Sequence, residues 1–147
     1  MASIQTLVAG AICSEPASED QLQAIERRLG LTLPLPLRTL YLQANGFREP
    51  LGNAAYLLSL EEMASFTEYF WRDWPLDAPQ GPDFSDYIVF GSSGADEHWA
   101  MHIAAPHQVI GYHHHMEGTP EELGNDLGAI FMRDFAIMRE FADGQPD

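Results

Sequence analysis

The sequence contains no lysine, and its seven arginines face 22 acidic residues, which gives a formal net charge of −15 at pH 7. A phosphate-binding P-loop needs a lysine that reaches the phosphates, so the absence of lysine excludes that class of nucleotide site. A chain this acidic repels nucleic acids and anionic membranes, whose binding depends on lysine and arginine. The composition therefore predicts neither a nucleic acid nor a membrane as partner, and it favours a basic protein.

Cysteine is nearly absent as well. Cys13 is the single cysteine, so the chain can form no internal disulfide, which favours a reducing compartment. No local signature of a cysteine nucleophile surrounds it. No apolar run approaches the roughly 18 residues that a membrane-spanning helix requires. No lysine or arginine precedes Arg27, although a secretory signal would need a basic start. These absences predict a cytoplasmic protein.

The apolar content that is present suffices for one compact domain. Hydrophobic residues make up 46% of the 147 positions, and a chain of this length buries about 70% of its unfolded surface. We therefore predict a single domain over residues 1–147. Residues 1–17 should pack on it, and the tail at 143–147 should fray.

A helical hairpin near the start of the chain organises this domain. Ser18 is a favourable N-cap, and Gln21 three residues later completes a capping box. Gly30 supplies the left-handed residue that ends the first helix. Pro36 suits the first turn of a second helix, 36–44, because its missing N–H costs nothing there. The apolar residues whose helical spacing predicts buried faces are Leu22, Ile25, Leu29, Leu37, Leu40, Tyr41 and Ala44.

The rest of the chain alternates strand patterns with helix patterns. Trp99, Met101 and Ile103 alternate with other residues and should share one face of a strand. Pro120 suggests a helix start at 119–122. Strands are predicted at 54–59, 87–90, 98–103 and 108–112, and helices at 18–29, 36–44, from Ser59 onward and at 127–141. The predicted fold class is α+β, a single domain with a mostly antiparallel or mixed central β-sheet flanked by helices.

The hairpin also carries a family resemblance. Its order of Leu-Gly, Leu-Pro, Arg, Leu and Asn-Gly-Phe resembles the opening signature of the SUKH superfamily, which joins bacterial immunity proteins to fungal cell-wall-assembly regulators. The residues that carry the resemblance are Leu29-Gly30, Leu33-Pro34, Arg38, Leu40 and Asn45-Gly46-Phe47, then Leu58–Glu62, Ile88–Gly91, Gly94 and Asp96. It covers roughly residues 18–140 and departs at 92–95, where a glycine-richer turn is common. The resemblance implies a SUKH-like fold and an immunity protein that neutralises a toxin, often a nuclease.

Catalytic and metal-binding motifs are weak in this sequence. On a strand, His98 and His102 would lie about 13 Å apart, too far to share one zinc ion. His113 and His115, in a tract of three histidines, could share a face about 7 Å apart with Glu117 nearby. This tract leaves a His/carboxylate metalloenzyme open as an alternative. We predict no catalytic residue, no metal site and no cofactor.

The negative charge is concentrated in the middle of the chain. Residues 49–126 hold 14 acids and one arginine, a balance of −13, whereas the flanks hold eight acids and six arginines, a balance of −2. The aromatic run 68–74 lies within this region, and tryptophan is enriched in interface hot spots. A generally acidic, solvated surface with aromatics in the core would explain both features equally well. The predicted partner-binding residues are Glu61, Glu62, Trp71, Asp73, Trp74, Asp77, Asp83, Asp86, Asp96 and Glu97.

The resemblance implies a non-catalytic immunity protein that binds a nuclease-type toxin, and the acidic middle of the chain predicts that the toxin is basic and that its active surface is occluded. A regulatory scaffold that binds a cellular protein is an alternative of the same class. The metalloenzyme is the alternative from a different class. We expect a monomer or a weak homodimer.

Overall fold

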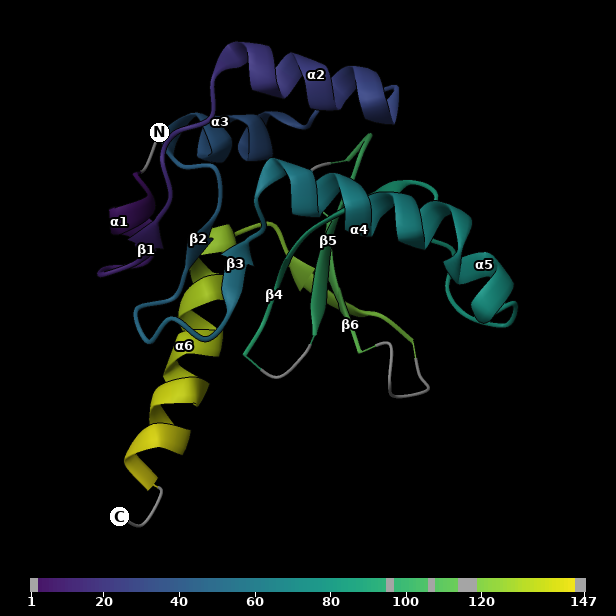
Figure 1. Cartoon of the computed structure of the whole chain (residues 1–147). Helices are drawn as coiled ribbons and strands as arrows, with labels where there is room; N and C mark the ends of the chain where they lie inside the picture. The colour runs from purple at the N-terminus through teal and green to yellow at the C-terminus, as the bar shows by residue number, and fades with distance from the viewer. Residues whose placement is uncertain (1–2, 95–96, 106–107, 114–118, 145–147) are drawn as a thin grey trace.

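A computed structural model describes residues 3–94, 97–105, 108–113 and 119–144 of the chain, with side chains up to residue 140. Helices and strands alternate along the described residues (Figure 1). In chain order they are α1 (Ile4–Leu7), β1 (Ile12–Cys13), α2 (Glu19–Leu29), α3 (Leu35–Gln43), β2 (Phe47–Arg48), β3 (Ala55–Leu57), α4 (Leu60–Arg72), α5 (Trp74–Asp77), β4 (Tyr87–Ser92), β5 (His98–His102), β6 (Val109–Tyr112), β7 (Glu121–Gly124) and α6 (Leu127–Gly144).

The predicted helical hairpin is confirmed as α2 and α3. The Ser18 hydroxyl accepts a hydrogen bond from the Gln21 N–H at 3.1 Å, and the Gln21 side-chain oxygen accepts one from the Ser18 N–H at 2.8 Å. Gly30 ends α2 in the left-handed conformation, with a φ of 72°. α3 begins at Leu35, one residue before the predicted start. The apolar positions predicted for the inner faces are all buried: Leu22, Ile25, Leu29, Leu37, Leu40, Tyr41 and Ala44.

The strands form two antiparallel sheets, in the orders β1-β2-β3 and β4-β5-β6-β7. The two sheets meet where β3 runs beside β4, and there the Leu58 N–H donates to the Phe90 carbonyl at 2.8 Å. This approach requires glycine at position 91, because a Cβ on Gly91 would lie 2.1 Å from the Tyr56 carbonyl oxygen. The predicted α+β class, with antiparallel strands flanked by helices, is confirmed.

The two faces of the four-stranded sheet pack against different elements. Trp99 and Met101 of β5 are buried in the main core, and Ile103 packs against the same core, so their predicted common face is confirmed. That face meets the three-stranded sheet and α6. Ala100 lies on the opposite face, in a second cluster with Phe70 of α4 and Trp74 of α5. α4 and α5 therefore cover one face of this sheet, as Figure 1 shows.

The predicted helix start at Thr119–Glu122 is wrong. Residues Glu121–Gly124 form β7 instead and pair antiparallel with β6. Without β7, the backbone groups of β6 on that edge would lack partners, and this requirement outweighs the local helical preference of Pro-Glu-Glu. The helix begins at Leu127, as predicted, where the Asp126 carboxylate accepts a hydrogen bond from the Ala129 N–H at 3.1 Å.

The segment before α2 packs on the domain in two ways. α1 contacts α6, and β1 pairs with β2, while Ile4 and Val8 are buried in the main core. At the other end, α6 runs to Gly144, and residues 145–147 of the tail that was predicted to fray lie outside the described residues. Within the described ranges, no helix is both long enough and apolar enough to span a membrane.

Leucines at two positions of α3 allow a matched test of the core. Leu40 is 3% exposed and Leu42 is 44% exposed. Leu40→Ala should lower the free energy of unfolding by about 2–5 kcal/mol, because it removes buried carbons and leaves a cavity. Leu42→Ala should change it by about 0.5 kcal/mol or less. Urea unfolding measures both, and equal shifts of the two midpoints would contradict the packing of α3.

Candidate protein-binding face

The start of α4 is fixed by hydrogen bonds that the surrounding sequence supplies. The Ser59 hydroxyl accepts from the Glu62 N–H at 3.2 Å, and the Asn45 side-chain oxygen accepts from the Leu60 N–H at 2.8 Å. Glu61 and Glu62 occupy the first turn, where negative charge suits the helix dipole. These hydrogen bonds fix the first turn of α4, and they therefore fix the positions from which its exposed side chains project.

The two tryptophans predicted as partner anchors fasten α4 and α5 to the rest of the domain. The half-buried Trp71 donates its indole N–H to the Tyr87 carbonyl at 2.9 Å. Trp74 is 6% exposed, lies in the second core cluster and donates its N–H to the Pro82 carbonyl at 3.0 Å. A partner can therefore reach little of either ring in this conformation.

The side of α4 that faces α2 is electrically balanced. Arg28 of α2 lies 3.1 Å from a Glu61 carboxylate oxygen and also pairs with Glu68. Arg72 lies 3.6 Å from the other carboxylate oxygen of Glu68. Glu61, one of the predicted contacts, is thus engaged by an arginine of the chain itself.

The adjacent exposed side of α4 keeps its negative charge. Glu62, Asp73 and Asp77 are exposed, and no ion pair joins any of them to another described residue. Together with Phe66 and Tyr69 they follow one another at intervals of three or four residues, which places them on one helical face that extends into α5. We call these five residues the outer stripe.

Tyr69 and Asp77 are linked within this stripe. The Tyr69 hydroxyl donates a hydrogen bond to the Asp77 carboxylate at 3.1 Å. Partial burial of the hydroxyl, together with this bond and the negative charges of Asp77 and Asp73, raises the pKa of Tyr69 above its usual value. The phenol therefore stays neutral at physiological pH and acts as a hydrogen-bond donor.

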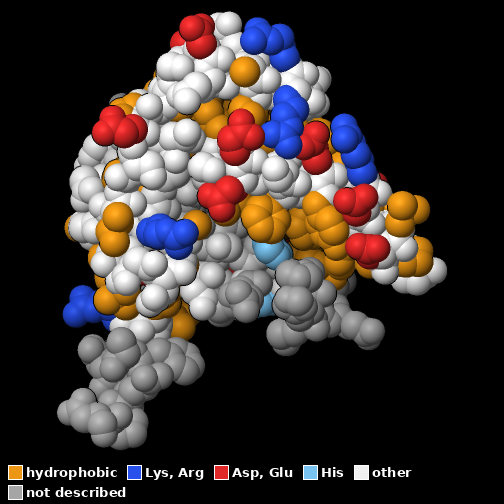
Figure 2. Space-filling view, in the orientation of Figure 1, with side chains coloured by type: hydrophobic (Ala, Val, Ile, Leu, Met, Phe, Trp, Pro, Cys, Tyr) orange, Lys and Arg blue, Asp and Glu red, His pale blue; other side chains and the backbone are white. Residues whose placement is uncertain are grey.

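An aromatic groove of about 380 Å³ opens beside the stripe, between α4 and β5. Its walls are Ser65, Phe66, Tyr69, Phe70 and His98, and we use the name aromatic groove for this set. The His98 ring centroid lies 5.7 Å from that of Phe66 and 5.4 Å from that of Phe70. Figure 2 shows hydrophobic side chains gathered over α4 and α5, a histidine at their edge and acidic side chains on both sides.

The remaining predicted contacts lie elsewhere. Asp83 and Asp86 are exposed in the segment before β4, and the Ser85 N–H bonds to the Asp83 carboxylate and lowers its pKa. Asp96 lies outside the described residues. Glu97 faces a different cleft. The structure thus brings three of the predicted acids together on the outer stripe, namely Glu62, Asp73 and Asp77.

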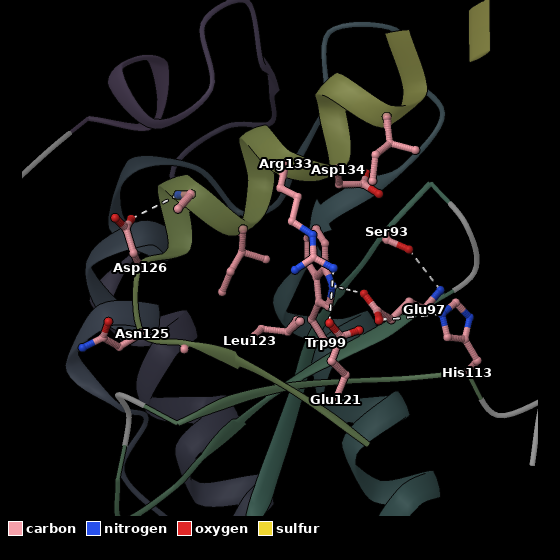
Figure 3. A pocket seen from close by; sticks show the side chains of 14 residues that line it. Ser93, Glu97, Trp99, His113, Glu121, Leu123, Asn125, Asp126, Arg133 and Asp134 are labelled. Carbon is pink, nitrogen blue, oxygen red and sulfur yellow. Dashed lines mark hydrogen bonds and ion pairs between the residues drawn. The ribbon is translucent and has the colours of Figure 1, made fainter. Parts of the chain in front are cut away.

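The cleft that contains Glu97 lies between α6 and the four-stranded sheet and has a volume of about 440 Å³ (Figure 3). Glu97 accepts a hydrogen bond from the Trp99 indole N–H at 2.8 Å, and its second oxygen is 3.7 Å from His113 Nε2. That distance exceeds a hydrogen bond, so the two groups do not form a positioned acid–base pair. Arg133 of α6 pairs with Glu121 of β7 across the cleft at 3.3 Å.

The acids of this cleft have structural partners within the chain. Asp134 is buried and accepts hydrogen bonds from the Tyr56 hydroxyl at 2.8 Å and the Gly94 N–H at 3.0 Å. Asp126 caps α6, and Glu97 is held by Trp99. The cleft therefore offers less unpaired charge to a partner than the outer stripe.

Metal ligation finds little support in the described part of the chain. No group of three or more His, Cys, Asp or Glu side chains there is arranged to hold a metal ion. His98 and His102 lie on a strand, as predicted, at opposite ends of β5. His114, His115 and Glu117 of the alternative metal site lie outside the described residues.

Phe66, Tyr69 and His98 are surface residues that the sequence analysis did not predict to bind a partner. Phe66 is 38% exposed, in contrast to Trp74. A signal for the two α4 residues was present, because Glu62, Phe66, Tyr69 and Asp73 recur at the spacing of one polar helical face. The histidine joins them only through the packing of α4 on β5.

Comparison with known protein families gives a match over most of the chain. The model of the SMI1 / KNR4 family (SUKH-1) matches residues 16–133. No curated protein matches the sequence.

Two phenylalanines of α4 allow a test of which aromatic residues are structural. Phe70 is 2% exposed, so Phe70→Ala should cost about 3–5 kcal/mol of stability. Phe66→Ala should cost about 1 kcal/mol or less, which shifts the thermal midpoint by at most about 4 °C in a domain of this size. Circular dichroism during heating measures both midpoints. A Phe66→Ala loss as large as that of Phe70→Ala would show that Phe66 belongs to the core.

Proposed function

Because this chain belongs to the SMI1 / KNR4 family (SUKH-1), whose members are commonly immunity proteins, we propose that it binds and neutralises a cognate protein toxin. The toxin is a basic protein, of the nuclease type that acts on nucleic acid in the cytoplasm. The immunity protein works by occlusion: it covers the basic surface with which the toxin would hold its substrate. No catalytic step by the immunity protein is needed.

The outer stripe carries this proposal. Three exposed carboxylates lie there without an ion pair to any described residue, whereas Arg28 and Arg72 balance the acids on the neighbouring side of α4. An acidic face of this kind attracts a positively charged partner over a distance and raises its association rate. A generally acidic surface would not need aromatic side chains exposed among the same acids.

A preformed face also suits inhibition by occlusion. The backbone of α4 is held by its cap and by the Trp71 bond to β4, so little order has to be gained when a partner binds. A surface that is already ordered loses less conformational entropy on association. Tight, long-lived binding is what an immunity protein requires.

Charge reversal on the outer stripe tests the proposal. The partner for this experiment is the toxin that the protein neutralises, sought first among the products of neighbouring genes. The variant Glu62→Lys/Asp73→Lys/Asp77→Lys should associate at least about tenfold more slowly at low salt, because long-range attraction is lost. The difference should shrink towards 1 M salt, where the Debye length falls from about 10 Å (at 0.1 M) to about 3 Å. Stopped-flow fluorescence measures the rates.

The matched control reverses three exposed acids that lie outside residues 49–126. Glu15→Lys/Asp20→Lys/Glu140→Lys changes the net charge equally and should leave the association rate within about threefold of the original protein. The stripe variant should also fail to protect cells that express the toxin, whereas the control variant should protect them. Equal slowing by both variants would refute the stripe as the binding face, and an acidic toxin would refute the electrostatic mechanism.

A further inference from the structure

The aromatic groove has features that electrostatic steering does not explain. Its walls include the exposed ring of Phe66 and the partly exposed ring of Tyr69, and it is apolar over most of its surface. Solvated carboxylates alone would steer a basic partner without such a recess. The groove therefore indicates that one side chain of the partner enters between α4 and β5.

Acidic groups stand around this recess. Glu62 lies one helical turn before Phe66, and Asp73 lies one turn after Tyr69. Asp77 is tied to the Tyr69 hydroxyl at 3.1 Å. At the Ser65 wall the Arg28 guanidinium donates to the Ser65 hydroxyl at 3.4 Å. The rim is therefore negative on the side of Tyr69 and Asp77. A side chain that fits both the aromatic walls and this side of the rim must be cationic and able to stack on rings.

Arginine meets these two requirements better than the other residue types. Its planar guanidinium stacks on aromatic faces and binds carboxylates in a forked geometry. It is also more weakly hydrated than an ammonium group, so it loses less hydration when it enters an apolar recess. A lysine would pair with the carboxylates of the rim, but its ammonium group would lose more hydration. An aliphatic side chain would pack against the aromatic walls, but it would make no interaction with the carboxylates.

The geometry points to an arginine side chain of the basic partner as the occupant of the aromatic groove, with its guanidinium against Phe66 and Tyr69 and towards the carboxylates of Asp73 and Asp77. This inference rests on the proposed function for the identity of the partner as a basic toxin. The preference of the groove for arginine belongs to this chain, and it can be measured without the toxin.

The experiment uses the full-length chain labelled with 15N and three neutral-backbone probes: the N-acetyl methylamides of arginine, lysine and norleucine. The arginine probe should cause saturable NMR shifts of the backbone amides of α4 and of His98, with a dissociation constant in the millimolar range, as expected for a ligand this small. The lysine and norleucine probes should bind at least about threefold more weakly.

Variants locate the arginine probe. Phe66→Ala should weaken its binding by about threefold to tenfold, because one aromatic wall is lost. Asp77→Asn should weaken the arginine probe and leave the norleucine probe unchanged. Leu76→Ala is the matched control, because Leu76 lies beside these residues, is 81% exposed and does not line the groove. It should bind the arginine probe as the original protein does.

Several results would overturn the inference. These are norleucine binding as tight as arginine binding, shifts centred on the Glu97 cleft, or no saturation by the arginine probe. Shifts at the groove on diluting the protein alone would show that a second copy of the chain occupies it, and this would also overturn the inference. If the arginine probe fails while charge reversal still slows toxin association, the proposed function stands and only the arginine assignment falls. If the probe binds as expected but no toxin does, the groove assignment stands and the immunity role falls.

Discussion

Tyr56 is the residue through which the separate parts of this fold meet. Its ring stacks on Phe131 of α6 at a centroid distance of 5.3 Å and lies 5.3 Å from the Trp99 ring of β5. Its hydroxyl donates to the buried Asp134 carboxylate, and its carbonyl lies against Gly91. Burial and the bond to Asp134 raise the pKa of Tyr56 far above its usual value, so this donor persists at any physiological pH. Both sheets and α6 therefore depend on the position of one side chain.

α4 does not contact Tyr56 in this set of interactions; it packs on the four-stranded sheet and exposes its outer side. α4 reaches the sheet through its inner side, where the Thr67 hydroxyl accepts a hydrogen bond from the Val89 N–H at 3.1 Å and Phe70 fills the second cluster. The side chains of the outer stripe lie at the surface, so substitutions there should change stability less than substitutions in the core. A binding surface on this side can diverge between relatives while the core stays the same. Such a division suits a protein that must match one particular partner.

The sequence correctly predicted the helices and strands that are marked by their own capping residues or by an alternating apolar pattern. Ser18 and Gly30 act as caps as expected, α4 begins directly after Ser59 as predicted, and the alternation around Trp99 correctly predicted a strand. The prediction failed at 119–122, where a helical preference yields to pairing with β6, the preceding strand, because residues 119–122 themselves carry no alternating apolar pattern that would signal a strand. The sequence could not show which acids of the candidate face are paired and which are unpaired, because the arginines that pair with some of them lie in another segment or on another turn of the helix. The tryptophans were chosen for residue type, and the structure shows their N–H groups bonded within the chain.

The positions of the seven arginines determine which parts of the acidic surface are neutralised and which keep their negative charge. Arg28 and Arg38 each contact two carboxylates, and both belong to the helical hairpin, so the hairpin region is close to neutral. The outer stripe has no arginine partner among the described residues, and its carboxylates accept hydrogen bonds only from neutral hydroxyls, at Glu62 and Asp77. A basic partner of the kind proposed would supply the positive charge that the chain does not place there. The absence of lysine thus has a structural consequence: every permanently charged basic side chain is an arginine, and the arginines nearest α4 pair with the acids on the side that faces α2.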